Sequence, residues 1–191
     1  MTYILIGILG FLMAYAFDWA SLKQLPVIKQ LAGLAAACLL VYAIVMVCLS
    51  PTKLELPTFT IPLGICLLLI FLPLLVYSLF IEIPFRSTYA NRGFGKKLIT
   101  VGTYALVRHP GVIWLAFVFL SLIPLFPSTT LFLAAIVWLA LDVIHVALQE
   151  KLFFTKMFPG YHDYQQQTPF LIPSRQSLSA CLKTIKPQTK N

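Results

Sequence analysis

Two polar segments lie beside long apolar runs, and their residue types are suited to binding a charged ligand. The first contains Tyr104, Arg108, His109 and Pro110, directly before an apolar run. A proline is well tolerated at the first position of a helix, so we expect His109 to cap a helix and Pro110 to begin it. The free N–H groups at that helix start, with the charge of Arg108, would hold a carboxylate or a phosphate. The alternative is that Arg108 and His109 only anchor and cap the helix.

The second polar segment lies at the end of a later apolar run. At about 100° per residue, Asp142, His145 and Gln149 share one helix face, and Glu150 follows directly. A polar stripe inside a membrane span usually marks a pocket, an ion path or an interhelical hydrogen-bond network. Asp142 and His145 are also possible metal ligands, but two ligands three residues apart favour a buried pair, and we predict no metal site.

The composition requires that membrane helices position these segments. The chain has 191 residues, 60% hydrophobic and only 10% charged, with a mean hydropathy of +0.90. Soluble domains contain about 25% charged residues, so a soluble domain is excluded. Five apolar stretches are long enough to cross roughly 30 Å of hydrocarbon, the fourth if it begins at Pro110. They are residues 3–19, 31–49, 59–81, 112–126 and 130–148. We predict an all-α, multi-pass membrane protein with about five transmembrane helices.

The basic residues predict the orientation of these helices. Lys and Arg concentrate in short cytoplasmic loops. With the N-terminus outside, all but one of the 14 basic residues fall on the cytoplasmic side, and Lys53 is the exception. We expect a cytoplasmic C-terminus, a single membrane domain over residues 1–173, and a basic, mobile cytoplasmic tail over residues 174–191. This distribution explains the net charge of +8, so we expect the lipid bilayer and no nucleic acid as partner.

A proline-rich turn at Pro124 and Pro127 makes the last two apolar stretches neighbours. Both polar segments then lie at the cytoplasmic ends of adjacent helices, and one pocket can use both. Arg108 would hold an anion in this pocket, and Glu150 would hold a cation. Three aromatic side chains would be available for stacking, Tyr104, Tyr161 and Tyr164. Such a pocket, open towards lipid, suits a zwitterionic cofactor and a lipophilic substrate.

The order of these residues resembles that of a known family. The run Gly102-x-Tyr104-x-x-Val107-Arg108-His109-Pro110, followed by Glu150, Tyr161-x-x-Tyr164 and Pro173, resembles the isoprenylcysteine carboxyl methyltransferases. These belong to a wider group of integral membrane methyltransferases that includes the phospholipid methyltransferases. The resemblance covers residues 97–173 and implies S-adenosylmethionine as cofactor, an active site facing the cytoplasm, and a lipophilic or small acceptor.

The resemblance also implies which residues form the site. His109 and the backbone after Pro110 would contact the cofactor, and Glu150 would meet its positively charged part. His109 and Glu150 are also the candidate catalytic residues, because a base is useful if the acceptor is an amine or a thiol. The full set of implied cofactor-binding residues is Tyr104, Arg108, His109, Pro110, Gln149, Glu150, Tyr161 and Tyr164.

Three positions depart from the pattern of that family. Val112 stands where the family often has Tyr, Gln149 stands where it commonly has Glu, and Phe170 stands where it often has Arg. If that Arg orients an acceptor carboxylate, its replacement by Phe170 argues against a prenylcysteine acid as substrate. The cofactor half of the motif is therefore better kept than the acceptor half.

Two other functions stay open at this point. The first is a haem-binding membrane protein or isomerase resembling the NnrU-like proteins, which also carry an R-H-P-type segment. His109 and His145 would then be the candidate haem ligands. The second is a non-catalytic relative of the methyltransferase fold, which would keep the fold as a binding or assembly module.

Overall fold

The structure is a computed structural model that describes residues 1–83 and 98–185. All regular elements in this part of the chain are helices, which confirms the predicted all-α fold. Four are long and apolar enough to span a membrane, and a fifth apolar helix, α5 (Pro110–Leu125), is shorter. The long ones are α1 (Thr2–Leu22), α2 (Pro26–Cys48), α3 (Thr60–Val76) with its π-helical extension η1 (Tyr77–Glu82), and α6 (Thr129–Gln149) with its extensions η3 (Glu150–Phe154) and α7 (Thr155–Met157). The predicted apolar stretches all form helices, while their orientation stays a prediction.

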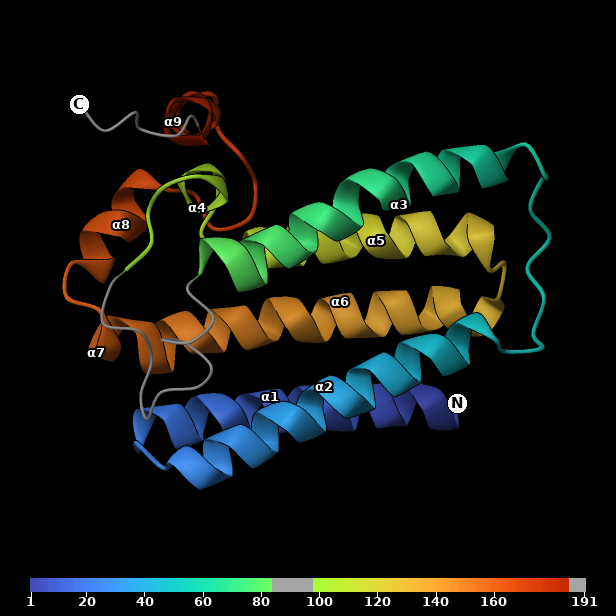
Figure 1. The fold of residues 1–191 in the computed structure, drawn as a ribbon, viewed down its shortest axis with the longest axis horizontal. Coiled ribbons are helices and arrows are strands. Elements are labelled where there is room, and N and C mark those ends of the chain that lie inside the picture. Colours follow the sequence, from blue (N-terminus) through green and yellow to red (C-terminus); the bar gives the residue numbers. More distant parts are fainter. Residues whose placement is uncertain (84–97, 186–191) are drawn as a thin grey trace.

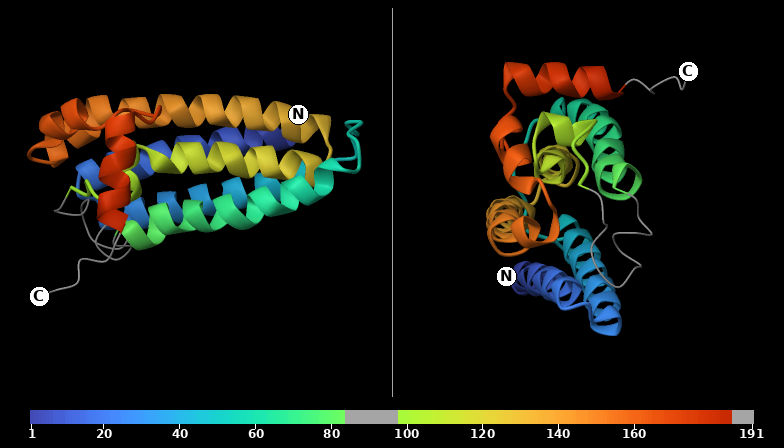
Figure 2. Two further views of the ribbon diagram at one scale, coloured as in Figure 1. Left: turned by 90° about the horizontal axis from the view of Figure 1, so that it is seen from above. Right: turned by 90° about the vertical axis from the view of Figure 1, so that its left-hand side faces the viewer.

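The spanning helices lie side by side along the long axis of the molecule (Figure 1). α1 packs along α2, α3 packs along α5, and α6 contacts α1, α2 and α5. α2 and α3 are not among the closely packed pairs, and α6 lies behind the space between them (Figures 1 and 2). The bundle therefore consists of two helix pairs that α6 joins at the back.

The core lies where α1, α2, α5 and α6 meet. Trp138 of α6 is 1% exposed, and its indole N–H donates to the carbonyl of Ile4 at 3.1 Å. Gly7 makes this approach possible, because a Cβ at this position would run into the Trp138 ring. Phe119 and Leu131 complete the packing around the indole. Packing and a hydrogen bond together hold α1 against α6.

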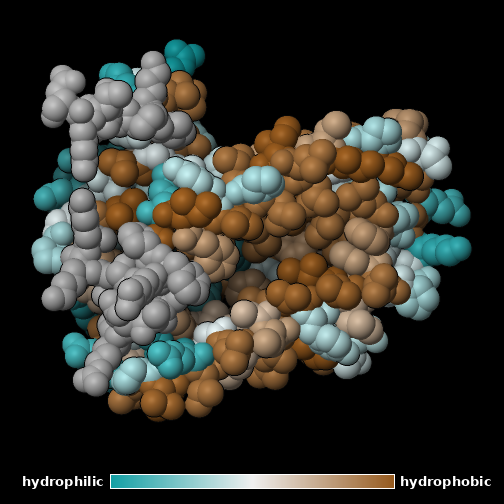
Figure 3. Space-filling view, viewed as in Figure 1, coloured by the Kyte–Doolittle hydropathy of each residue, from teal (hydrophilic) through white to brown (hydrophobic). Residues whose placement is uncertain are grey.

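The outer faces of the spanning helices are apolar. Large side chains on these faces, such as Leu12, Leu69 and Ile136, are more than half exposed. Figure 3 shows hydrophobic residues over the middle of the bundle and hydrophilic residues towards its ends. Exposing apolar surface to water costs about 25 cal/mol per Å², so these faces are suited to lipid. The chain is an integral membrane protein.

Three short helices gather at the end of the bundle opposite Met1 (Figure 1). They are α4 (Thr103–Leu106), α8 (Tyr161–Gln167) and α9 (Arg175–Ile185). α9 lies across the direction of the spanning helices and packs on α4, where Cys181 is buried against Val107 (Figure 2). The predicted mobile tail thus begins with a packed helix, because Ser177 and Cys181 find a surface to bury against. Residues 186–191 lie outside the described part.

Candidate functional site

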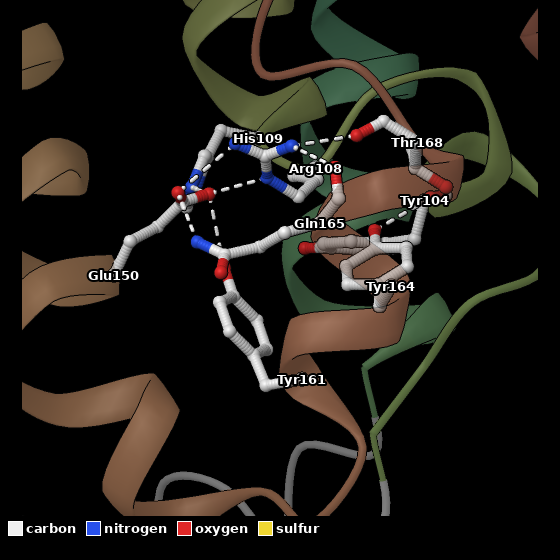
Figure 4. A network of polar contacts seen from close by, with 8 residues as sticks. All are labelled: Tyr104, Arg108, His109, Glu150, Tyr161, Tyr164, Gln165 and Thr168. Atoms are coloured by element: carbon white, nitrogen blue, oxygen red, sulfur yellow. Dashed lines mark hydrogen bonds and ion pairs between the residues drawn. The ribbon is translucent and has the colours of Figure 1, made fainter.

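The carboxylate of Glu150 gathers the polar side chains at this end of the bundle (Figure 4). Arg108 donates from Nε to Oε1 at 2.6 Å and from Nη2 to Oε2 at 3.0 Å. His109 Nε2 lies 2.8 Å from Oε1. The Tyr161 hydroxyl donates to Oε1 and the Gln165 amide donates to Oε2, both at 3.0 Å. Protein donors therefore occupy both oxygens, and direct contact of Glu150 with a positively charged ligand stays a prediction.

Irregular backbone brings these groups together. Glu150 begins the π-helical turn η3, and such turns inside helices are frequent at functional sites. Arg108 lies in the short non-helical segment between α4 and α5, and its backbone N–H donates to the carbonyl of Pro169 at 2.9 Å. Its Nη1 donates to the carbonyls of Gln165 at 3.0 Å and Thr168 at 2.6 Å. Arg108 thus ties the start of α5 to both α8 and the end of α6.

His109 stands at the N-cap position of α5 and Pro110 at its first position, as predicted. The prediction that the His109 side chain caps the helix is wrong, because no hydrogen bond joins it to the helix backbone. The imidazole turns instead to Glu150, between the rings of Phe154 and Phe170, whose centroids lie 6.1 and 5.2 Å away. A hydrogen bond from His109 to a carboxylate is charge-assisted and therefore stronger than one that its ring would accept from a backbone N–H, which explains this orientation.

Burial and neighbouring charges set the protonation of this network. Burial lowers the pKa of His109, and the Arg108 charge lowers it further, while the bond to Glu150 opposes this only in part. His109 is therefore neutral at pH 7, and since a carboxylate only accepts hydrogen bonds, its proton is on Nε2 and its Nδ1 keeps a lone pair. Burial acts against the charge of Arg108, but Glu150 outweighs it and raises the Arg108 pKa. Burial and the Glu150 charge raise the pKa of Tyr161, which stays a donor.

We expect the folded protein to lose stability as the pH falls below about 6.5, the ordinary pKa of histidine. In the unfolded chain His109 takes up a proton near this pH, whereas in the folded chain it does so only at lower pH. Protonation therefore favours the unfolded state. Above about pH 7, His109 is neutral in both states and adds no pH dependence to the free energy of unfolding. Unfolding temperatures measured in detergent from about pH 8 to 5 test this. His109→Gln should flatten the decline, and an unchanged decline would contradict the assignment.

A cavity of about 1430 Å³ opens beside the network. Pockets for one small ligand usually measure roughly 300–1,000 Å³, so this cavity has room for two ligands. Arg108, His109 and Tyr161 line one wall, whereas Glu150 lies behind them and is not part of the lining. Side chains of α2, α3 and η1 also line the cavity, and Figure 3 shows the surface hollowed between α2 and α3. The cavity thus runs from a polar wall towards the bilayer.

A second polar group lines the same cavity within the spans. Asp18 of α1 accepts hydrogen bonds at Oδ2 from His145 Nε2 and Gln149 Nε2, both at 2.7 Å. The predicted shared face of Asp142, His145 and Gln149 does face this cavity. Asp18 was missed, although an acidic residue inside an apolar stretch is a signal of function. The two candidate haem ligands, His109 and His145, each face a carboxylate, and no group of three metal-ligating side chains occurs among the described residues.

The remaining predicted residues, Tyr104 and Tyr164, join the cavity wall to the bundle. The Tyr164 hydroxyl donates to the carbonyl of Tyr104 at 2.6 Å, and the Tyr104 hydroxyl donates to that of Ser78 at 3.2 Å. Both tyrosines line the cavity. Glu82, at the end of η1, accepts hydrogen bonds from the backbone N–H of Thr103 at 2.7 Å and from its hydroxyl. The segment leading to Arg108 is therefore held from two sides.

Gly102 is the residue that lets this segment approach Glu82. Its φ of +61° is unfavourable for a side chain, and a Cβ would collide with the Glu82 carboxylate. We expect Gly102→Ala to cost about 1–3 kcal/mol in the free energy of unfolding. Gly160→Ala is the matched control, because Gly160 also has a positive φ, +79°, but no atom within 4 Å of a new Cβ. Equal losses in thermal unfolding of the two variants would show that the contact with Glu82 adds nothing.

Comparison with protein families gives a match to the family described as phospholipid methyltransferase, over residues 59–160. Curated proteins and solved structures give no significant match. The matched residues are just over half of the chain and include α3, α5, α6 and Glu150. α1 and α2, with Asp18, lie outside the match, and so does α8, with Tyr161 and Tyr164.

Proposed function

The chain belongs to the phospholipid methyltransferase family, and on this basis we propose that it transfers a methyl group from S-adenosylmethionine to a lipophilic or small acceptor. One observation carries the proposal: a wall of Arg108, His109 and tyrosine side chains forms part of a cavity whose remaining lining is mostly apolar. A charged cofactor and an apolar acceptor can then meet inside one enclosure.

The residues of the wall fit this cofactor. S-adenosylmethionine supplies an electrophilic methyl group on a positively charged sulfur, and it also carries a carboxylate and a flat adenine. Arg108 and the start of α5 at Gly111 line the cavity where a carboxylate would be stabilised by positive charge and N–H groups. The rings of Tyr104, Tyr161 and Tyr164 suit both the adenine and the sulfonium. Glu150 would act through these neighbours by holding Arg108, His109 and Tyr161 in place.

Orientation is the main contribution we assign to the chain. Methyl transfer needs the acceptor aligned with the methyl group and kept from water, and both effects accelerate the reaction without a covalent intermediate. The apolar side chains of α2 and α3 would admit the acceptor from lipid and exclude water. The neutral His109 keeps a lone pair on Nδ1, which can take the proton that an amine or thiol acceptor loses.

The charge distribution supports a cytoplasmic site. Lys23, Arg108, Lys156 and Lys183 belong to elements at the end of the bundle that holds the site. Lys53 lies in the connection at the opposite end, where its backbone forms an isolated antiparallel β-bridge with Ser128. Because basic residues concentrate on the cytoplasmic side, we propose that the site faces the cytoplasm and that Met1 lies outside.

Calorimetric titration of S-adenosylmethionine into the detergent-purified protein tests the proposal. We expect binding at micromolar strength, and at least about tenfold weaker binding in His109→Ala, since about 1.4 kcal/mol is tenfold in affinity. His162→Ala is the matched control, because His162 is exposed on α8 and does not line the cavity. The proposal fails if the folded wild-type protein does not bind the cofactor, or if both variants bind it equally.

A further inference from the structure

A large part of the cavity is lined by the N-terminal helix pair. Side chains of α1 and α2, among them Phe17, Asp18 and Leu40, form this wall together with Asp142 of α6. α1 and α2 lie outside residues 59–160, the segment shared with the methyltransferase family. The wall therefore combines side chains from outside the shared segment with Asp142, which lies inside it.

Asp142 is an acidic side chain of this wall, and it accepts no hydrogen bond from the described residues. It lies on the cavity side of α6, one turn from His145, whose Nε2 is taken by Asp18. An ionisable side chain inside a membrane span has a large cost and marks a functional site by default. A carboxyl group that lines a cavity without a protein partner can recover that cost by binding a donor on a ligand.

Charge on the same wall restricts what this ligand can be. Asp18 adds a second carboxylate, held towards His145 and Gln149 at 2.7 Å. The cations that line the cavity in the described part of the chain are Arg108, which is paired with Glu150, and Lys156 in α7. Near Asp142 a head group with negative charge would meet two carboxylates, whereas Lys156 lies fourteen residues further along the same helix, about 20 Å away at 1.5 Å per residue. A head group that donates hydrogen bonds would supply the donors that the Asp142 carboxyl group lacks.

We propose that Asp142 is the contact for the acceptor head group, which carries N–H or O–H donors and no negative charge. This inference rests on the proposed function, since it names the acceptor half of the same site. The Asp18–His145–Gln149 contacts position the wall by joining α1 to α6 beside Asp142. The apolar remainder of the acceptor would extend past Leu40 and Leu79 towards the opening between α2 and α3.

The test uses three single-chain probes with the same tail, dodecylamine, dodecanol and dodecanoate, added to the full chain in detergent. The measurement is the shift of the unfolding temperature, with each probe at a concentration about tenfold above its dissociation constant. We expect dodecylamine to raise it by about 3–5 °C, with a smaller rise for dodecanol and none for dodecanoate. Asp142→Asn should lose most of the dodecylamine shift. Asp163→Asn, the same change at an exposed site outside the cavity, should keep all of it.

The inference is overturned if dodecylamine does not stabilise the wild-type protein, if Asp142→Asn responds as the wild type does, or if dodecanoate stabilises equally. S-adenosylmethionine titration of the same samples separates this failure from that of the proposed function. Asp142→Asn should bind the cofactor within about twofold of wild type, because Asp142 lies eight residues, about two helical turns, before Glu150, the partner of Arg108. A wild-type protein that binds dodecylamine through Asp142 but not the cofactor would overturn the proposed function alone.

Discussion

Replacing Glu150 by Ala should abolish measurable binding of S-adenosylmethionine and destabilise the fold. The change removes the acceptor of five hydrogen bonds from four side chains and leaves the Arg108 guanidinium, 11% exposed, beside an empty space. Breaking a buried ion pair by removing one partner costs about 3–5 kcal/mol. Calorimetric titration measures the binding, and thermal unfolding in detergent measures the stability.

Two further variants make the role of Glu150 testable. Glu55→Ala, at an exposed site in the α2–α3 connection, is the control for loss of a carboxylate and should change neither quantity. Arg108→Ala should be strongly destabilising by itself, but the double variant should lose less than the sum of the single variants, because each single change strands the other charge. Additive losses would show that Glu150 and Arg108 act independently and would contradict the positioning role assigned to Glu150.

Replacing Asp18 by Asn should lower the free energy of unfolding by about 2–4 kcal/mol, mainly by loosening α1 from α6. Asp18 is 2% exposed and accepts hydrogen bonds from both His145 and Gln149 at the same oxygen. The amide oxygen of the introduced Asn is a weaker acceptor than a carboxylate. If the amide were flipped, its NH₂ group would face the donors of His145 and Gln149. The charge of Asp18 also interacts with that of Lys29, whose side chain is fully buried in α2.

The measurement for this variant is thermal unfolding, combined with cofactor titration. Asp163→Asn is the matched control on the exposed face of α8 and should unfold at the wild-type temperature. S-adenosylmethionine affinity should fall by no more than a few-fold in Asp18→Asn, because Arg108, His109 and Glu150 lie on other elements. If cofactor binding were lost while stability stayed unchanged, Asp18 would be a cofactor ligand and not a link between helices.

The amino-acid sequence by itself determined the helices and where most of them begin. Apolar runs of membrane-spanning length can satisfy their backbone hydrogen bonds only as helices, so the five stretches followed from local composition. Pro110 begins α5 as predicted, because a proline restricts the backbone locally whatever surrounds it. The local sequence also indicated a functional site near Arg108 and Glu150, because polar groups next to apolar spans have an energetic cost.

Only the tertiary structure decided which polar groups meet. Arg108 and Glu150, assigned separately to an anion and a cation, bind each other, because α8 and the π-helical turn after α6 bring them within 2.6 Å. Asp18 binds His145, which is 127 residues away in the sequence, because α1 packs on α6, and no local sequence pattern predicts this packing. α9 forms because α4 offers a surface for Cys181. A side chain's type and its cost of burial are local properties, whereas its partner depends on helix packing over the whole chain.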